Sequence, residues 1–427
     1  MASAASLVSM LETTNGEQPS STELLEKPAP KSSSMSVSPS AKKLPYQVLG
    51  QWLGFSNHDQ ELWWLNTAPF LGNLLAQSNY DVDEQYQYLS FYHTHIVPVL
   101  GPYFHPGVEP HWMSYFTSEG HPLEVSLNLQ GSKAIIRLGL EPLSPFAGSE
   151  RDPLNQFMGR EFLGQMARIQ PCIDLQWFNH FDSELGLSLE DARAIAGTVP
   201  KQGKTQHLVG FDFKNGGIVP KAYFYPEHKA RVTGVNTAKL LFNAVRKLEE
   251  SKSFSGALDT LEEFLAPCFK DKTENQTENT TEVFILAIDC LVPSLSRIKL
   301  YVADTQVTFA KARELWTLGG VLNDATTLTG LRILEDIWNM LGIGDSCSSL
   351  MDVNRLPLLS NYEFKPGAPY PKPQLYIPLH GKNDDVVADQ MTKVFEYLQW
   401  NGLAARYKEE LASNLYDSPS PISSILS

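Results

Sequence analysis

The sequence predicts an α+β fold in which an antiparallel β-barrel of repeated strand–strand–helix–helix units is surrounded by a ring of helices. Two observations predict it. Pairs of short segments that alternate apolar and polar residues recur along the chain, and helical patterns follow each pair. Corresponding cationic residues also recur at nearly constant spacing, 84 residues from Arg137 to Lys221 and 78 residues from Lys221 to Lys299. Such regular spacing indicates one structural unit that is used repeatedly.

Four strand pairs carry this pattern. They are predicted at residues 123–129 with 134–140, 208–213 with 218–225, 283–289 with 297–303, and 361–364 with 374–379. The turn Asn215-Gly216 is a strong hairpin signal, because both residues accept a positive φ. Consecutive hairpins favour an antiparallel sheet, and a sheet of eight or more twisted strands tends to close on itself. The eight strands therefore predict a barrel.

Helical patterns fill the segments between the hairpins. Two amphipathic helices are expected between residues 44 and 101, the second starting near Asp83. Further helices are expected at 153–169, 187–196, 237–250, 256–265, 308–318, 328–341, 386–400 and 404–415. Helices inserted after each hairpin cover the outer face of the sheet, so they are expected to form a ring around it.

The chain is expected to hold one large folded domain. Residues 1–44 are rich in Ser, Pro, Lys and Ala and lack apolar periodicity, so they are expected to form a flexible leader. The barrel domain is expected to span residues 45–416. Residues 417–427 show no strand alternation and are expected to form an irregular tail.

Composition excludes several function classes. A formal charge of −14 argues against nucleic acid or an anionic membrane surface as a general partner, because these need clustered Lys and Arg. No run of about 18 apolar residues could span a bilayer. The 4 cysteines show neither a CxxC pair nor metal-ligand spacing, which predicts free thiols in a reducing compartment. We therefore expect a cytoplasmic protein. For its oligomeric state we expect a monomer or a homodimer, which composition does not decide.

In three of the four predicted hairpins, the second strand carries the same chemical pattern. Residues two apart on a strand share a face, so polar and aromatic side chains gather on one side while apolar ones gather on the other. The motifs are Lys221-x-Tyr223, Arg297-x-Lys299-x-Tyr301 and Gln374-x-Tyr376, and Arg137 alternates with apolar neighbours in the same way. If the apolar face packs on helices, this second face looks into the barrel. The alternative is a solvent-exposed polar face with ordinary cross-strand pairs.

The interior face is suited to a particular ligand. Four cations in a confined space would repel one another unless an anion neutralises them, and a diphosphate matches that need. Tyrosine rings in the same row attract a cation by about 0.5 to 2 kcal/mol each when water is excluded. Cations and tyrosines together suit an allylic diphosphate, which carries a diphosphate on one side and an electron-poor carbon on the other.

Several motifs taken together resemble a known family, the fungal indole prenyltransferases of the dimethylallyltryptophan synthase type. The motifs are Leu123-Glu124-Val125-Ser126, Arg137-Leu138-Gly139-Leu140-Glu141-Pro142, Lys221-Ala222-Tyr223, Arg297-Ile298-Lys299-Leu300-Tyr301 and Leu315-Trp316-Thr317-Leu318-Gly319-Gly320. The resemblance covers residues 44–415. It implies a ten-stranded antiparallel barrel ringed by helices. It also implies transfer of a dimethylallyl group to an indole in alkaloid biosynthesis, with neither metal nor cofactor.

The resemblance implies a role for each candidate site residue. The diphosphate-binding residues would be Arg137, Lys221, Arg297, Lys299 and Gln374, and the cation-shielding residues would be Tyr223, Tyr301 and Tyr376. Glu124 would be catalytic, holding the indole N–H and enriching the ring in electron density. Leu123, Glu124 and Gly139 would line the acceptor pocket, with Gly139 leaving room for the acceptor. An exposed strand glutamate and a structural strand glycine are the alternatives for Glu124 and Gly139.

Finer details lean towards one branch of the family. The chain is similar to enzymes of brevianamide and notoamide assembly, which implies a tryptophan–proline diketopiperazine as acceptor, with or without a hydroxyl on the indole. It departs from the family at its C-terminal end. One more period of roughly 77 residues after Tyr376 would fall near position 453, beyond the last residue, Ser427. We therefore expect eight of the family's ten strands, without its last hairpin.

Two further motifs resemble known phosphate or metal sites but depart from them at one position each. Asp384, Asp385 and Asp389 approach a DDxxD magnesium motif, but the third Asp is one position too far, and acids favour a helix start anyway. Gly203-Lys204-Thr205 lacks the first glycine of a P-loop. The remaining alternatives are a non-catalytic barrel that binds a phosphorylated ligand and an inactive truncated paralogue. Glu124 argues against the first, since a phosphate-binding protein gains nothing from a carboxylate beside its cations.

Overall fold

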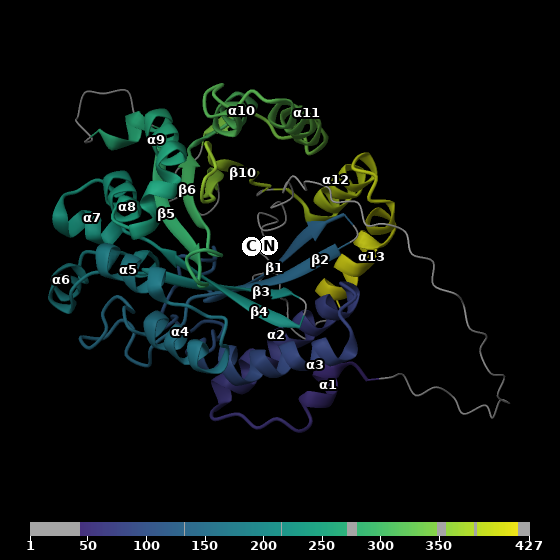
Figure 1. The fold of residues 1–427 in the computed structure, drawn as a ribbon. Coiled ribbons are helices and arrows are strands. Elements are labelled where there is room, and N and C mark those ends of the chain that lie inside the picture. The colour runs from purple at the N-terminus through teal and green to yellow at the C-terminus, as the bar shows by residue number, and fades with distance from the viewer. Residues whose placement is uncertain are drawn as a thin grey trace.

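The computed structural model describes residues 43–131, 133–214, 216–270, 280–347, 356–379 and 382–416. Residues 1–42 of the predicted leader and the whole predicted tail, 417–427, lie outside the described residues. The described chain forms a curled sheet with helices around its outer side (Figure 1). This arrangement confirms the predicted α+β fold with a ring of helices.

The main sheet is antiparallel throughout and has eight strands. Its strands, in spatial order, are β1 (Leu123–Gln130), β2 (Lys133–Leu140), β3 (His207–Lys214), β4 (Gly217–Phe224), β5 (Thr281–Asp289), β6 (Ile298–Asp304), β9 (Leu358–Phe364) and β10 (Lys372–Tyr376). A separate pair is formed by β7 (Gln306–Val307) and β8 (Ser346–Cys347). Within the described ranges β1 and β10 stand at the two ends of the sheet and do not pair with each other.

The strand predictions hold for all four hairpins, with shifts at the fourth. β9 begins at Leu358, three residues before the predicted start, and β10 ends at Tyr376. Pro378 lies within the predicted second strand, and it cannot donate a hydrogen bond to a neighbouring strand. The predicted 374–379 strand is therefore wrong at its C-terminal end, while the interior-facing residues at its start lie in β10.

Thirteen α-helices lie in the described residues. They are α1 (Pro45–Leu49), α2 (His58–Gln77), α3 (Val82–Phe91), α4 (Met158–Ile169), α5 (Gln176–Leu185), α6 (Leu189–Ile195), α7 (Glu227–Thr233), α8 (Thr237–Arg246), α9 (Ser255–Phe264), α10 (Phe309–Thr317), α11 (Ala325–Met340), α12 (Asp384–Tyr397) and α13 (Asn401–Tyr416). Three of these helices, α1, α5 and α7, lie outside the helices expected from the sequence. Together the helices surround the sheet from α1 to α13 (Figure 1).

The start of α4 was predicted five residues too early. The preceding segment is held instead by side chains that bond to backbone: Asp152 Oδ1 accepts from the Gln156 N–H at 2.6 Å, and Asn155 Oδ1 accepts from the Ser144 N–H at 3.0 Å. Asn155 adopts a positive φ of 50°, which no helix contains. Local side-chain hydrogen bonds of this kind compete with helix formation.

The outer face of the sheet packs against the helices and forms the main core. On β4 the buried Ala222 and Phe224 alternate with Lys221 and Tyr223, so the latter two point to the opposite, interior side. Phe213 on β3 stacks on Tyr88 of α3 with ring centroids 4.4 Å apart. The apolar face therefore goes to the helices, as predicted, and the polar face lines the inside of the curled sheet.

None of the described helices combines the length and apolar character that a membrane crossing requires. Asp384 and Asp385 lie in the first turn of α12, whose N-terminus is capped by Asn383 Oδ1 accepting from the Asp385 N–H at 2.9 Å. This placement confirms the helix-start interpretation of the aspartate pair. Within the described residues, no group of three or more His, Cys, Asp or Glu could hold a metal ion.

Candidate active site

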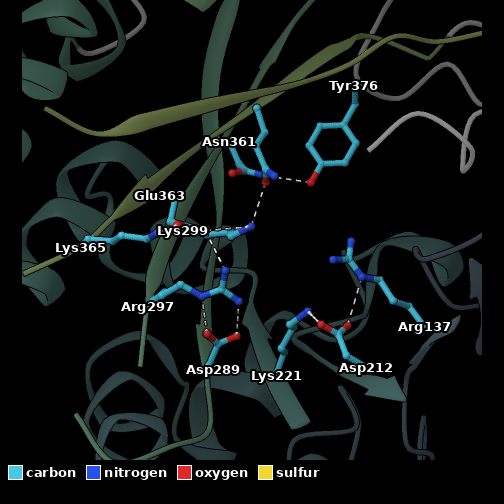
Figure 2. Close-up of polar contacts among 11 residues, drawn as sticks. Arg137, Asp212, Lys221, Asp289, Arg297, Lys299, Asn361, Glu363, Lys365 and Tyr376 are labelled. Atoms are coloured by element: carbon cyan, nitrogen blue, oxygen red, sulfur yellow. Dashed lines mark hydrogen bonds and ion pairs between the residues drawn. The ribbon is translucent and has the colours of Figure 1, made fainter. Parts of the chain in front are cut away.

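Charges of alternating sign cross the interior face of the sheet, and we call this set the charge row. It consists of Arg137, Asp212, Lys221, Asp289, Arg297, Lys299, Glu363 and Lys365. In the strand register Lys221 of β4 lies opposite Asp289 of β5, and Lys299 of β6 lies opposite Glu363 of β9. Side chains directly opposite on antiparallel strands share a face and touch. Figure 2 shows them reaching toward one another from different strands.

Asp212 joins two of the predicted diphosphate ligands. Its Oδ2 lies 2.6 Å from Lys221 Nζ and its Oδ1 lies 3.2 Å from Arg137 Nε. Burial alone would raise the pKa of Asp212, but Lys221 and Arg137 outweigh burial and hold this pKa below its usual range. Burial lowers the pKa of Lys221, although Asp212 opposes that shift. The two cations are thus held in place on the interior face by one carboxylate.

Asp289 and Glu363 hold the other cations. Arg297 donates to Asp289 Oδ2 from Nε at 2.7 Å and to Glu363 Oε2 from a terminal nitrogen at 3.0 Å. Lys299 Nζ lies 3.4 Å from the same Glu363 oxygen, and Lys365 Nζ lies 3.5 Å from the other. Both carboxylates are buried, with side chains 7% and 5% exposed. Figure 2 shows these contacts as one connected group.

Lys299 also links the charge row to the polar end of β10. Its Nζ donates to Gln374 Oε1 at 2.8 Å, and Asn361 Nδ2 donates to the same oxygen at 3.0 Å and to the Tyr376 hydroxyl at 2.7 Å. Burial lowers the pKa of Lys299 to about 8, against the opposing effect of Glu363. The five predicted diphosphate ligands therefore lie on one face in two contact groups, one around Asp212 and one around Asp289 and Glu363, and the strand register places Lys221 opposite Asp289 between them.

The three predicted shielding tyrosines form a continuous wall beside the cations. Ring centroids are 6.2 Å apart between Tyr223 and Tyr301 and 6.1 Å apart between Tyr301 and Tyr376. Burial raises the pKa of Tyr223 and of Tyr301 well above the usual value, so both hydroxyls stay neutral at physiological pH. Neutral rings with negative faces are the arrangement that attracts a cation.

Glu124 lies on the same interior face, at the β1 end of the sheet. It is opposite Gly139 in the register, and Arg137 is two residues from Gly139 on β2. Glu124 is also close enough to Tyr225 to contribute, after burial and other neighbours, to raising the pKa of that phenol. Leu123, in contrast, is 1% exposed in the main core, on the opposite face of β1. The side chain of Leu123, one of the three predicted acceptor-pocket residues, therefore points to the face opposite that of Glu124.

Gly139 was expected to leave room for an acceptor, and in the structure a ring occupies that room. A Cβ built on Gly139 would lie 2.2 Å from Cζ of Phe116 and 2.6 Å from its Cε1. Phe116 belongs to the segment that precedes β1, and the glycine lets its ring approach the backbone of β2. The missing side chain thus serves the packing of Phe116 beside Glu124.

The segment that carries Phe116 is anchored through a buried carboxyl. The Tyr115 N–H donates to Thr205 Oγ1 at 2.9 Å, and the Thr205 hydroxyl donates to Glu141 Oε2 at 2.8 Å. Burial raises the pKa of Glu141, whose hydrogen bonds only partly oppose that shift. The Tyr115 ring meets Tyr225 edge to face at 5.9 Å. This chain of contacts fixes an aromatic wall on the acceptor side.

Sequence reasoning missed Asp212, Asp289, Glu363, Asn361 and Phe116. The three acids occupy interior positions on strands that neighbour the cationic ones, so a predicted strand order would have brought them to the same face. Asn361 alternates with the buried, outward-facing Tyr362 in the same way. Phe116 lies in a segment without periodicity, and no signal in the sequence pointed to it.

Comparison with known proteins decides the family. The sequence profile described as tryptophan dimethylallyltransferase matches residues 59–410, a range that includes every candidate site residue. The chain belongs to this family. The resemblance found in the sequence motifs is thereby confirmed.

Two curated relatives show the enzymatic class. The indole diterpene prenyltransferase anaPT of Neosartorya fischeri is 46% identical over 373 residues, which cover 87% of this chain and 84% of that protein. The trans-prenyltransferase abpB of Aspergillus terreus is 43% identical over 362 residues, which cover 84% of this chain and 92% of that protein. The chain is a prenyltransferase of the indole-modifying family.

Solved structures of the family share the fold. The crystal structure of AnaPT from Neosartorya fischeri aligns with a TM-score of 0.81 at 44% identity, covering 89% of this chain and 92% of that one. The structure of NotF in complex with brevianamide F and DMSPP aligns with a TM-score of 0.76 at 32% identity, with the same coverage of both chains. The predicted barrel fold of this family is confirmed.

Proposed function

We propose that this family member moves a dimethylallyl group from dimethylallyl diphosphate to the indole ring of a tryptophan-containing cyclic dipeptide. The reaction is an electrophilic aromatic substitution that needs no metal. The observation that carries the proposal is the charge row, which lies beside the wall formed by Tyr223, Tyr301 and Tyr376, with Glu124 on the same interior face.

The cations act on the leaving group. When the bond between the allylic carbon and the ester oxygen breaks, the electron pair stays on the oxygen and the diphosphate gains one negative charge. Preorganised cations stabilise such developing charge most effectively where water is excluded. Lys221 and Lys299 are suited to this role because their side chains are mostly buried, at 13% and 17% exposure, and lie close to other cations of the row.

The tyrosine wall protects the cation that remains. Each ring contributes about 0.5 to 2 kcal/mol of cation–π attraction when desolvated. Water must be kept away, since it would capture the cation as an alcohol. Tyr301 is the central ring, within 6.2 Å of Tyr223 and 6.1 Å of Tyr376, so it contributes to the whole wall.

Glu124 is proposed to orient the acceptor. A carboxylate that accepts a hydrogen bond from the indole N–H raises the electron density of the ring as it attacks the cation. The ring carbon forms the new bond with the electron pair of a ring double bond and then loses its proton, which restores aromaticity. Glu124 faces the interior opposite Gly139, next to Phe116, in a position to meet a flat aromatic acceptor.

A tryptophan–proline diketopiperazine, with or without an indole hydroxyl, is the preferred acceptor. The support is the similarity to NotF, whose structure holds brevianamide F together with DMSPP, across 89% of this chain at 32% identity. A cytoplasmic location and a monomeric or homodimeric state complete the proposal. Size-exclusion chromatography with light scattering tests the oligomeric state.

The proposed function has a direct test. Purified protein is incubated with dimethylallyl diphosphate and a panel of tryptophan cyclic dipeptides, with a chelator present, and products are analysed by mass. We expect one added five-carbon unit on a tryptophan–proline diketopiperazine. Activity that disappears with chelator would contradict metal independence. Diphosphate binding without product across the whole panel would favour the non-catalytic barrel or the inactive paralogue.

A further inference from the structure

The charge row contains more negative charge than a diphosphate site requires. Three carboxylates stand among five cations, so the row is left with an excess of two positive charges. Asp212, Asp289 and Glu363 are mostly buried, at 16%, 7% and 5% side-chain exposure, and each contacts at least one predicted diphosphate ligand. A site built only for tight binding of a polyanion would exclude such groups, because they repel it.

We propose that Asp212, Asp289 and Glu363 are resident counter-ions, which neutralise the cations in the empty site and, by competing with bound diphosphate, limit its affinity so that it can leave after transfer. This inference rests on the proposed function. It concerns a different step, the release of the leaving group.

The contacts support competition for the same nitrogen atoms. Lys221 Nζ lies 2.6 Å from Asp212 Oδ2, and the two ends of the Arg297 guanidinium are engaged by Asp289 and Glu363. A diphosphate oxygen that binds these groups must share them with, or displace, a carboxylate oxygen. The empty site avoids the high cost of unpaired buried charge, and the filled site holds its anion less tightly.

Competition between the carboxylates and the diphosphate would help the diphosphate to leave after transfer. Breaking the allylic bond adds one negative charge to the diphosphate, so a site that binds the donor through electrostatics alone binds the product more tightly still. Uniform tight binding of this kind slows turnover, because product release is rate-limiting in many enzymes. The carboxylates offset the increase without removing the cations that stabilise the transition state.

The test is a calorimetric titration of the full chain with inorganic diphosphate, combined with product-inhibition kinetics. Asp212→Asn keeps the side-chain shape and removes the charge. Asp259→Asn is the matched control: its carboxylate pairs with Arg246 at 2.7 Å on helices outside the sheet, so it changes net charge equally and leaves the row intact. Asp212→Asn removes the carboxylate that pairs with Lys221, which could disturb the fold. Glu363→Gln is therefore the second variant, because Lys299 there still donates a hydrogen bond to Gln374.

We expect Asp212→Asn and Glu363→Gln to bind diphosphate about tenfold tighter than the unaltered chain and to show stronger product inhibition, with a lower kcat and an initial burst. Asp259→Asn should match the unaltered chain. Weaker or unchanged diphosphate binding in the folded row variants would overturn the inference and show that the carboxylates only position the cations. Absence of diphosphate binding to the unaltered chain would instead overturn the proposed function.

Discussion

The ring of Phe116 stands in the space that a side chain on Gly139 would need, because a Cβ there would lie 2.2 Å from Cζ of Phe116. The two residues come from different parts of the chain, a loop before β1 and the C-terminal end of β2. The contact between Phe116 and Gly139 sets how closely the loop before β1 can approach the interior face of the sheet. Gly139 lies opposite Glu124 in the register, so the fit also shapes the surroundings of the proposed acceptor site.

A methyl group at this position should therefore disturb the loop. We expect Gly139→Ala to destabilise the fold by about 1 to 3 kcal/mol, as overpacked sites do, and to raise the KM for the acceptor. Phe116→Ala in the same chain should recover much of that loss, since it removes the clashing ring. Thermal unfolding and acceptor kinetics of the two single variants and the double variant measure the coupling.

The matched control for this cycle is Gly164→Ala on α4. No atom lies within 4 Å of a Cβ built there, so the added methyl has open space and improves helix propensity. We expect an unchanged or slightly higher melting temperature. Strictly additive effects of Gly139→Ala and Phe116→Ala would show that the two residues do not constrain each other.

Glu124 should matter for transfer and not for donor binding. We expect Glu124→Gln to lower kcat by about 100-fold or more, because the amide no longer carries the negative charge that activates the indole. Inorganic diphosphate should bind with unchanged affinity. Glu109→Gln is the control, since that carboxylate is 82% exposed and pairs with Lys201 outside the charge row. Wild-type kcat in Glu124→Gln would remove Glu124 from the mechanism.

The sequence was sufficient for the sheet and the cations because both depend on local periodicity. Lys221 and Tyr223 alternate with Ala222 and Phe224, so the sequence alone shows that the first two share one face of the strand, whatever the strand order. The role of the carboxylates could not be predicted without the order and register of the strands. Asp212 stands between two phenylalanines on β3, and its meaning depends on the register that brings it against Arg137.

Other parts of the site lay beyond sequence reasoning because tertiary packing decides them. Gly139 was expected to leave room for the acceptor, but in the structure Phe116 fills the space beside it, and that residue comes from a loop without a repeating pattern. The place of Leu123 in the acceptor pocket was implied by the resemblance to the family and not by the alternation along the strand. The period of two along β1 instead turns its side chain into the core.

Diphosphate binding should weaken at alkaline pH through Lys299. Burial lowers the pKa of Lys299 to about 8, so the free protein carries this charge below that pH and loses it above. A bound anion favours the charged form and raises the pKa. Affinity should therefore be highest below about pH 8 and should fall by up to about tenfold per pH unit above it, with proton uptake on binding.

Calorimetry in buffers of different ionisation enthalpy measures that proton uptake. The charged groups that act on Lys299 are Glu363, Arg297, Lys221 and Arg137, and burial also lowers the pKa of Lys221. Lys299→Arg keeps a charge at every pH and should flatten the dependence on pH. An equally steep fall in Lys299→Arg would assign the titration to Lys221 or to the diphosphate itself.

Tyr301 provides a test of the shield that separates ring from hydroxyl. We expect Tyr301→Phe to keep most activity, because the aromatic face remains. Tyr301→Leu should lose roughly 2- to 30-fold in transfer, which corresponds to about 0.5 to 2 kcal/mol of cation–π attraction.

The partition of the donor is the more telling measurement for this residue. With the central ring gone, water should reach the cation more often, so Tyr301→Leu should convert a larger share of donor to dimethylallyl alcohol than the unaltered chain does. Tyr397→Leu, at a phenol that is 40% exposed on α12, controls for loss of a tyrosine elsewhere. An alcohol-to-product ratio that stays constant across all three variants would mean that the tyrosine wall packs the interior without shielding a cation.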